Sequence, residues 1–304
     1  MKLSIVIVSW NTSAMLEACL ASVYLFPPHD QFEVWVVDNH SSDDTVSMVQ
    51  RKFPQVNLIV SEENLGFAGG NNLAIARCVG EFILLLNSDT EVKANALQRL
   101  IDFMNANVDA GAVGSRLLNM DGSLQVSCHP FPTLLRELWR LFHLDGLYAY
   151  SEYRMALWRT DVPRRVEAIK GASLMLRRMV LETVGYLDER YFMYSEEVDL
   201  CFQINRAGWQ LYWEPGSEVV HYGEQSTRQV AQEMFLQLYR GKLIYFRKNY
   251  GRIAGIAYKL ILALAALARL SLLPIAWWRW PSKREKNRVL AQNYKCLLTA
   301  LPSM

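Results

Sequence analysis

Four apolar runs near the start of the chain decide its fold: SIVIVSW at residues 4–10, FEVWVVDN at 32–39, VNLIVSE at 56–62 and EFILLLNSD at 81–89. Runs that are apolar almost without interruption are typical of parallel strands buried on both faces of a sheet. Stretches with helical spacing of apolar residues separate them, at 12–25, 42–53 and 70–78. This alternation predicts an α/β domain with a doubly wound sheet, in which ligands bind at the carboxyl ends of the strands.

The composition is that of a globular protein without a strongly charged surface. Of the 304 residues 51% are hydrophobic, and 32 Lys and Arg nearly balance 30 Asp and Glu. Nucleic acid is therefore not an expected partner. The five cysteines form neither a CxxC pair nor a zinc-type cluster, which is typical of a reducing compartment. We expect residues 1–10 to form a buried strand rather than a signal peptide, because no small-residue cleavage site follows them.

Polar side chains follow the four runs, where the strand ends of a doubly wound sheet converge on one crevice. They are Asn11, Asp38, Asn39, Asn64, Asn87 and Asp89. At such an end Asp89 can hold a divalent cation that bridges and neutralises a diphosphate leaving group. The alternative is that Asn87 and Ser88 only cap the following turn.

The segment ENLGFAGGNN at 63–72 places three glycines within five residues, ahead of an Ala-rich helix. Its backbone amides and the helix N-terminus could approach a phosphate or a ribose, although an ordinary glycine-rich turn has the same composition. The chain has no GxGxxG after the first strand and no GxxxxGK[ST]. The sequence therefore does not favour a dinucleotide-binding enzyme or a P-loop enzyme.

Three acidic residues, Glu196, Glu197 and Asp199, lie within YFMYSEEVDLCFQINRAGW at 191–209. Acids at the start of a helix interact favourably with its dipole, and a cluster of acids can equally set the pKa of one carboxylate for use as a general base. Spacing alone leaves both interpretations open. His221, after the strand-like EVV, is by itself more often a structural residue than a ligand.

Together, seven segments in one order resemble glycosyltransferase family 2, especially its rhamnosyltransferase-like branch, over residues 3–226. They are SIVIVSWN, VVDNHSSDDT, ENLGFAGGNN, LLLNSD, KGASLMLRR, GYLDERYFMYSEEVDLCFQINRAGW and VVHYGEQS. The resemblance implies a GT-A fold, a nucleotide-sugar donor and a single displacement that inverts the anomeric carbon. It implies a donor pocket formed by Asn11, Asp38, Asn64, Gly66, Phe67, Asn71 and Asn87.

The resemblance also implies roles for the remaining polar residues. Asp89 is the acid of a DXD-like motif that binds Mg²⁺ or Mn²⁺, and His221 completes the metal shell. Glu197 is the base that deprotonates the acceptor; the family usually has Asp there, so Glu196 stays an alternative base. We assign Asp199 and Trp209 to the acceptor side.

The expected division places the GT-A catalytic domain at 1–226, with a nucleotide-binding half at 1–110 and an acceptor-binding half at 111–226. A helical region follows at 227–304. Its apolar part, 253–280, is long enough to span a bilayer, but Lys259, Arg269 and Arg279 interrupt it.

We therefore expect a helix that lies on the cytosolic face of a membrane. Lys248, Arg252 and Lys259 are predicted to share one helical face, and Trp277, Trp278 and Trp280 cluster near Pro281. The alternatives are a buried helical hairpin broken at Pro274, or the interface of a homo-oligomer.

The predicted function is transfer of a sugar, L-rhamnose from dTDP-rhamnose being favoured by the branch, to a glycan or polyprenyl-linked acceptor in cell-surface polysaccharide synthesis. One alternative is a nucleotidyltransferase, although no basic glycine-rich loop follows the first strand. Another is an inactive protein that binds nucleotide sugars, which the Glu196-Glu197 pair leaves open.

Overall fold

The computed structural model describes residues 1–223, 230–274, 282 and 284–304. The chain divides into two compact units, which we call unit 1 and unit 2. Unit 1 comprises residues 1–131, 153–192 and 196–229, and unit 2 comprises 132–152, 193–195 and 230–304. The segments 132–152 and 193–195 thus group with the C-terminal helices, which no pattern in the sequence predicts.

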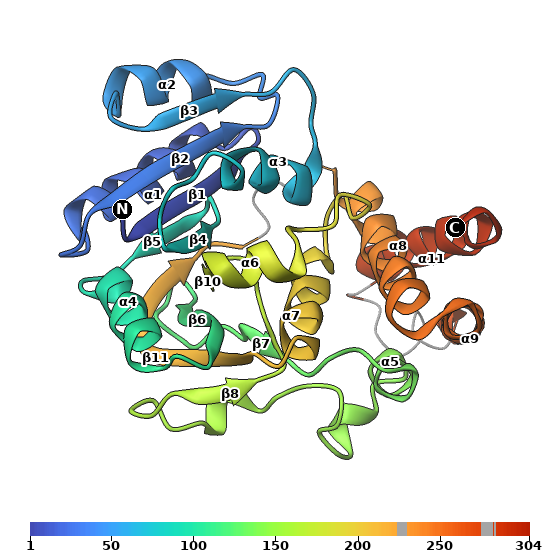
Figure 1. Cartoon of the computed structure of the whole chain (residues 1–304). Coiled ribbons are helices and arrows are strands. Elements are labelled where there is room, and N and C mark those ends of the chain that lie inside the picture. The colour runs from blue at the N-terminus through green and yellow to red at the C-terminus, as the bar shows by residue number, and fades with distance from the viewer. Residues whose placement is uncertain (224–229, 275–281, 283) are drawn as a thin grey trace. The chain divides into compact units, whose positions relative to one another are not determined.

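Unit 1 is built on one sheet that, in the described residues, has nine strands (Figure 1). Eight of them follow the order β3-β2-β1-β4-β10-β6-β11-β5, and β8 pairs with β11. The strands are β1 (Leu3–Ser9), β2 (Phe32–Asp38), β3 (Asn57–Val60), β4 (Phe82–Leu86), β5 (Thr90–Val92), β6 (Ala110–Leu118), β8 (Arg164–Val166), β10 (Ser173–Arg177) and β11 (Gln210–His221). A short pair of strands, β7 (Cys128–His129) and β9 (Ala168–Ile169), accompanies this sheet.

The four apolar runs form the parallel part of the sheet, as their composition predicts. Strands β3, β2, β1 and β4 pair in parallel in that order, so their carboxyl ends meet at one edge. Beyond them the sheet is mixed, because β10 runs antiparallel to both β4 and β6, and β5 runs antiparallel to the end of β11. The predicted α/β fold with a GT-A-type sheet is confirmed.

Alternate residues of the central strands feed two separate cores, one on each face of the sheet. Ile5, Ile7 and Leu84 belong to the core that includes residues of α1 (Ser13–Leu25), α2 (Thr45–Lys52) and α4 (Ala96–Ala106). Val6 and Leu85 belong to the opposite core, which includes residues of α3 (Gly66–Ile75), α6 (Arg178–Val184) and α7 (Glu196–Arg206). Burial on both faces explains why these strands read as continuous apolar runs.

The glycine-rich helix begins earlier than its Ala-rich part predicts. Helix α3 starts at Gly66 instead of Gly70, so the three glycines lie inside its first turns. Gly66 has a φ of +69°, and a Cβ there would lie 2.1 Å from the carbonyl oxygen of Phe192. The glycine is therefore required for close packing against the 190s segment, which spacing alone does not predict.

Unit 2 consists of α5 (Leu134–Leu141), α8 (Ala231–Tyr250), α9 (Arg252–Ser271) and α11 (Arg284–Ala300), among its described residues (Figure 1). Gly251, with a φ of +89°, separates α8 from α9. Lys248 therefore lies on α8 while Arg252 and Lys259 lie on α9, and the prediction that the three share one helical face is wrong. Trp277, Trp278, Trp280 and Pro281 lie outside the described residues.

A buried ion cluster joins three of these helices. Glu137 of α5 accepts hydrogen bonds from Lys242 of α8 at 2.6 Å and from Arg140 at 2.7 Å, and Tyr258 of α9 lies 3.4 Å away. Burial alone would raise the pKa of Glu137, but the two cations hold it at about 2. Burial lowers the pKa of Lys242 to about 8. Near neutral pH the carboxylate and its two cationic partners are all charged.

Candidate donor and metal site

Hydroxyl groups connect the ends of β1 and β4, where the sheet topology places the candidate site. The Thr12 Oγ1 atom lies 3.0 Å from Ser9 Oγ and 3.1 Å from Ser88 Oγ. All three side chains are buried. This chain of hydroxyls links the turn after β1 to the Asn87-Ser88-Asp89 turn after β4.

At the end of β2, Asp38 has one carboxylate oxygen available for a ligand. The side chain is 1% exposed, and its Oδ2 atom accepts from the Ser41 amide at 3.1 Å. The Oδ1 atom is buried and has no hydrogen-bond partner within the described part of the chain. Since an unsatisfied buried acceptor costs free energy, this oxygen is suited to accept from an N–H donor of a bound molecule.

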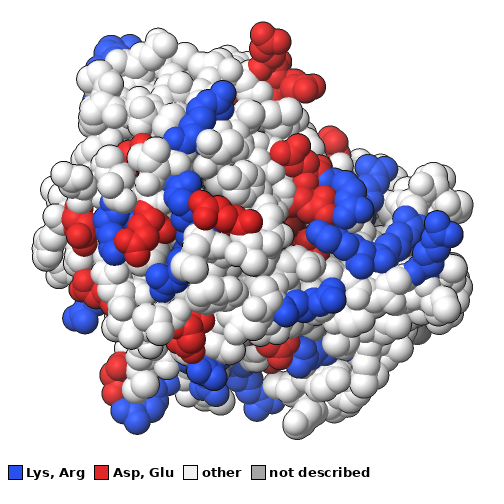
Figure 2. All heavy atoms as spheres, viewed as in Figure 1, with Lys and Arg blue, Asp and Glu red and all other residues white. Residues whose placement is uncertain are grey.

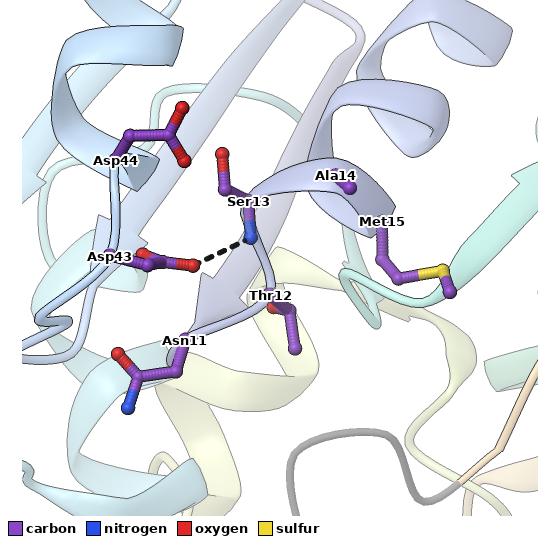
Figure 3. Close-up of a pocket in the computed structure, with 7 residues that line it drawn as sticks. All are labelled: Asn11, Thr12, Ser13, Ala14, Met15, Asp43 and Asp44. Carbon is purple, nitrogen blue, oxygen red and sulfur yellow. Dashed lines mark hydrogen bonds between the residues drawn. The ribbon is translucent and has the colours of Figure 1, made fainter.

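Asn11 lies in a hollow of about 420 Å³ where the turn after β1 meets the start of α2 (Figure 3). Asn11 has a φ of +52°, and its Oδ1 atom accepts from the Ser42 amide at 2.7 Å. Asp43 closes the other side by accepting from the Ser13 amide at 3.0 Å, as the dashed line in Figure 3 shows. The hollow is lined by Asn11, Thr12, Ser13, Ala14, Met15, Asp43 and Asp44.

The amides of the glycine-rich segment are already used within the protein. The Gly66 amide donates to Asn64 Oδ1 at 3.0 Å, and the Phe67 amide donates to the Phe192 carbonyl at 2.8 Å. Asn39 ties this turn to the end of β2 by donating to Asn64 Oδ1 at 2.8 Å. The amide hydrogens of Gly66 and Phe67 thus point to acceptors within the protein, and the role of these two residues in the donor pocket stays a prediction.

Two other donor-site predictions fall on side chains with internal roles. Asn71 is buried in α3 and donates to the Phe67 carbonyl at 2.8 Å, four residues earlier. Asn87 lies in the turn after β4, where its Nδ2 atom is 3.3 Å from His221 Nε2. Asn71 thus supports the helix that carries Phe67, and Asn87 lies next to the predicted metal residues.

Asp89 and His221 lie side by side because β5 pairs with the end of β11. His221 is opposite Thr90 in this antiparallel ladder, and the Tyr222 amide donates to the Asp89 carbonyl at 2.9 Å. The His221 Nε2 atom is 3.4 Å from Asp89 Oδ1, and both side chains are buried. The structure therefore brings together two residues that are 132 positions apart in the sequence.

Gln125 determines which ring nitrogen of neutral His221 carries the hydrogen. The Gln125 Nε2 atom donates to Asn119 Oδ1 at 3.0 Å and to the His221 carbonyl at 3.1 Å, so its amide oxygen must point elsewhere. That oxygen lies 2.6 Å from His221 Nδ1. Nδ1 is therefore the donor, and Nε2 is the acceptor nitrogen, which lies 3.3 Å from Asn87 Nδ2 and 3.4 Å from Asp89 Oδ1. Gln125 follows no motif, so the sequence analysis missed it.

The Asp89 and His221 side chains fit a divalent cation. Asp89 Oδ1 and the Nε2 atom of neutral His221 are both acceptors 3.4 Å apart, and a cation bound by both would replace the amide of Asn87 as the partner of Nε2. Octahedral ligand bonds of about 2.1 Å place neighbouring ligand atoms roughly 3 Å apart, close to the observed 3.4 Å. Within the described ranges no third His, Cys, Asp or Glu joins them. Mg²⁺-type sites commonly use one or two protein ligands and take the rest from substrate phosphates and water.

The two adjacent acids at the start of α7 differ in environment. Glu196 is 3% exposed and its Oε2 atom has no hydrogen-bond partner among the described residues, whereas Glu197 is only partly buried. Burial, and secondly the charge of Glu197, raise the pKa of Glu196 well above its ordinary 4.5. A Cβ at Gly171 would lie 3.0 Å from Phe67 and 3.7 Å from Glu197 Cβ. Glu197 is thus the less buried residue of the two, although its Oε2 atom is also buried, and like Phe67 it lies beside Gly171.

The two predicted acceptor residues are packed within the protein. Asp199 is 2% exposed and accepts from Gln203 at 3.4 Å, one turn along the same helix. Trp209 follows the end of α7, an 11-residue helix about 16 Å long that begins next to Glu197. It packs against the core near Gly111. We therefore leave Trp209 out of the proposed acceptor site.

The model of the glycosyl transferase family 2 matches residues 4–169. An N-acetylglucosaminyl-diphospho-decaprenol L-rhamnosyltransferase of Mycobacterium tuberculosis is 29% identical over 247 residues, which is 74% of this chain and 77% of that protein. The rhamnosyltransferase WbbL of Escherichia coli K12 is 24% identical over 213 residues, 63% of this chain and 76% of WbbL.

A solved structure, the mannosyltransferase PcManGT of Pyrobaculum calidifontis in complex with GDP-Man and Mn²⁺, has a TM-score of 0.60. It is 18% identical, with 98% of this chain and 85% of that chain covered. The likeness supports the fold. The match to the family model extends over more than half of the sequence, and the chain belongs to glycosyl transferase family 2. The prediction of a nucleotide-sugar glycosyltransferase of the rhamnosyltransferase-like branch is confirmed.

Proposed function

We propose that this glycosyltransferase is metal-dependent and inverting, and that it transfers L-rhamnose from dTDP-rhamnose to a polyprenyl diphosphate-linked N-acetylglucosamine. The name of the mycobacterial relative supports the acceptor and the sugar. The observation that carries the proposal is the Asp89–His221 pair beside the end of β4, at the sheet edge where Asp38 keeps an unsatisfied acceptor.

Each residue has a separate task in the proposed reaction. Asp38 Oδ1 accepts from an N–H of the nucleobase, such as the imide of thymine. A divalent cation held by Asp89 and His221 would supply charge neutralisation for the diphosphate. Glu197 takes the proton of the acceptor hydroxyl as that oxygen forms a bond to the anomeric carbon. The bond from the anomeric carbon to the diphosphate breaks on the opposite side, which inverts the configuration and releases dTDP.

Glu197 is favoured over Glu196 as the base because a base must be ionised and must reach the acceptor. Glu196 is buried, and burial together with the charge of Glu197 raises its pKa, which favours its protonated form. A protonated carboxyl cannot accept the hydroxyl proton. When Glu196 is protonated, the adjacent pair carries one negative charge, which lies on Glu197. Asp199, buried on the same helix, is proposed to support the acceptor side indirectly.

We further propose that α9 attaches the enzyme to the cytosolic face of a membrane. Helix α9 is long and apolar enough to cross a bilayer, by length and composition, and 33% of it is buried. Ile253, Ile256, Leu260, Leu264 and Leu267 are each 54–84% exposed. They recur at intervals of three, four, four and three residues, which places them on one stripe of the helix.

Charge supports the membrane as the partner of this stripe. The exposed charges described on α8, α9 and α11 are mostly basic: Arg240, Arg247, Lys248, Arg252, Arg284, Arg288 and Lys295 against Glu233 and Glu285. Figure 2 shows Lys and Arg side chains gathered over these helices. An apolar stripe with basic neighbours binds anionic lipid interfaces. Attachment there would bring the enzyme to a lipid-linked acceptor.

The reaction is tested by incubating the purified protein and Mn²⁺ with dTDP-rhamnose, UDP-sugars and GDP-sugars, each with a GlcNAc-diphospho-polyprenol acceptor. We expect dTDP from dTDP-rhamnose together with a rhamnosylated lipid whose anomeric configuration, read by NMR, is opposite to that of the donor. Formation of dTTP and rhamnose 1-phosphate when pyrophosphate is added, in place of dTDP, would indicate a nucleotidyltransferase. Binding of dTDP-rhamnose without turnover under every condition would indicate a protein that has lost catalysis.

A further inference from the structure

Helix α8 of unit 2 is in direct backbone contact with a three-residue segment, Met193–Ser195, which also belongs to unit 2. The contact is made at Gly241, which is buried in the middle of α8. A Cβ at Gly241 would lie 2.4 Å from the Tyr194 carbonyl oxygen and 3.3 Å from Ser195 Oγ. A distance of 2.4 Å to a carbonyl oxygen is far inside van der Waals contact, so any side chain at Gly241 must displace the segment or the helix.

The segment itself has an unusual backbone. Tyr194 and Ser195 have φ angles of +70° and +73°, the left-handed region that residues with a Cβ seldom adopt. Two consecutive residues of this kind persist only where their surroundings hold them. The backbone of α8 at Gly241 provides such a surrounding. The next two residues of the chain are Glu196 and Glu197, so this strained turn sets where α7 begins.

Helix α8 is in turn fixed next to the same glycine. Lys242 donates to the buried Glu137 carboxylate at 2.6 Å, and Arg140 donates to the other oxygen of that carboxylate. This cluster fixes α8 against α5 and prevents α8 from sliding or rotating by a small amount. The close contact at Gly241 is thus made by a helix, α8, whose position against α5 is fixed.

We propose that Gly241 is a positioning residue for the catalytic base: through Tyr194 and Ser195 it fixes the start of α7, and with it the Glu197 carboxylate. This inference rests on the proposed role of Glu197. It assigns the C-terminal helices a part in catalysis that is separate from membrane attachment. A base that moves by about 1 Å can lose on the order of 100-fold in rate while the donor binds as before.

The test compares Gly241→Ala with Gly255→Ala, each in the full chain. Gly255 is also a buried helical glycine of unit 2, but a Cβ there meets the side chain of Arg247, at 2.5 Å from Cγ, and no backbone oxygen. Alanine favours the helix at both positions, so helix propensity does not separate the two variants. The measurements are kcat and donor KM for rhamnosyl transfer, and the affinity for dTDP in the presence of Mn²⁺.

We expect Gly241→Ala to lower kcat by roughly 10- to 100-fold, with donor KM and dTDP affinity within about twofold of wild type, and Gly255→Ala to behave as wild type. Equal kcat values in the two glycine variants would overturn the inference, provided that Glu197→Gln is inactive in the same assay. If Glu197→Gln keeps the wild-type kcat, the proposed base is wrong, and the inference fails with it.

A second pair of variants tests the segment without changing α8. Tyr194→Gly and Ser195→Gly keep access to positive φ but also allow negative φ, so they loosen the turn without adding atoms. We expect each to lower kcat by about three- to tenfold at unchanged dTDP affinity. If Gly241→Ala does not fold, unchanged kcat in both of these variants overturns the proposal.

Discussion

The Gln125 amide oxygen lies 2.6 Å from Nδ1 of His221, and this contact makes Nε2, 3.4 Å from Asp89 Oδ1, the acceptor nitrogen of the neutral ring. Outer hydrogen bonds of this kind orient a histidine for metal binding in many proteins. Gln125 is itself fixed by two hydrogen bonds that its amide nitrogen donates. The proposed metal site therefore depends on a residue that would not touch the cation.

Removing the amide oxygen should weaken metal binding without removing a ligand. We expect Gln125→Leu to lower the affinity for Mn²⁺, measured by electron paramagnetic resonance in the presence of dTDP, by roughly 10- to 100-fold. Gln125→Glu keeps an acceptor for Nδ1 and should lose less affinity than Gln125→Leu. Wild-type Mn²⁺ affinity in Gln125→Leu would show that the ring needs no such support.

Glu196 should be replaceable by its neutral isostere. Its folded pKa lies above the ordinary 4.5, so the protonated carboxyl favours the folded state and stability declines as the pH rises from 4.5 toward the folded pKa. Glu196→Gln mimics the protonated form, so we expect its stability not to decline over this pH range. At pH 7 its free energy of unfolding should exceed that of wild type by up to about 1 kcal/mol.

The same variant separates the two candidate bases. Glu196→Gln should keep kcat within about threefold of wild type, because the amide preserves the packing and Glu197 remains. Urea unfolding at pH 4.5 and pH 7 measures the stability of this variant, and a transfer assay measures its kcat. A loss of turnover as large as that of Glu197→Gln would make Glu196 the better candidate for the base.

The fold could be predicted from the sequence because its strands have an unambiguous pattern. The four apolar runs form β1 to β4, and the two that lie inside the sheet beside each other, β1 and β4, are buried on both faces. Residues 128–165 lack such periodicity, and the helix α5 within them is held by Glu137, Lys242 and Arg140. A buried ion cluster of this kind brings together residues about 100 positions apart, which no local pattern shows.

The candidate site could be predicted only where motif residues lie at strand ends. Asp38, Asp89 and His221 lie where the sheet topology and the family resemblance place them. The family resemblance assigns Gly66 and Phe67 to the donor pocket, and in the structure their amides donate to Asn64 and to the Phe192 carbonyl. Whether a glycine admits a ligand or another part of the chain depends on tertiary packing, so spacing could not decide it.

The Glu137 cluster should make unit 2 sensitive to acid. The folded pKa of about 2 lies below the ordinary 4.5, so the carboxylate stabilises the fold above pH 4.5, and this contribution is lost as the pH falls toward 2. In Glu137→Gln the buried Lys242 loses its counter-charge, which should cost about 3–5 kcal/mol at pH 7. Glu233→Gln, an exposed change on α8, is the control.

Denaturant unfolding at pH 3 and pH 7 measures both effects. Wild type should lose stability between these pH values by more than Glu137→Gln does, since only wild type has this carboxylate to protonate. A Glu137→Gln protein as stable as wild type at pH 7 would mean that the cations are solvated and that the cluster does not fasten α5 to α8.

Charge placed on the exposed stripe of α9 should detach the enzyme from membranes. Leu260→Glu and Leu264→Glu, both at side chains that are 61% exposed, should together reduce sedimentation with anionic liposomes by about tenfold or more. Val289→Glu together with Leu290→Glu on α11, 53% and 40% exposed, adds the same charge outside the stripe and should sediment nearly as wild type. Equal sedimentation of all three proteins would contradict membrane attachment through α9.

The most direct test asks whether Glu197 acts in turnover and Asp89 in metal-dependent donor binding, by measuring the two properties separately. dTDP affinity with and without Mn²⁺, and kcat for rhamnosyl transfer, are measured for Glu197→Gln and Asp89→Ala. We predict that Glu197→Gln keeps Mn²⁺-dependent dTDP binding while kcat falls by about 1000-fold, and that Asp89→Ala loses the Mn²⁺ dependence of binding along with turnover. Near-normal kcat in Glu197→Gln, or Mn²⁺-dependent binding that persists in Asp89→Ala, would contradict the account.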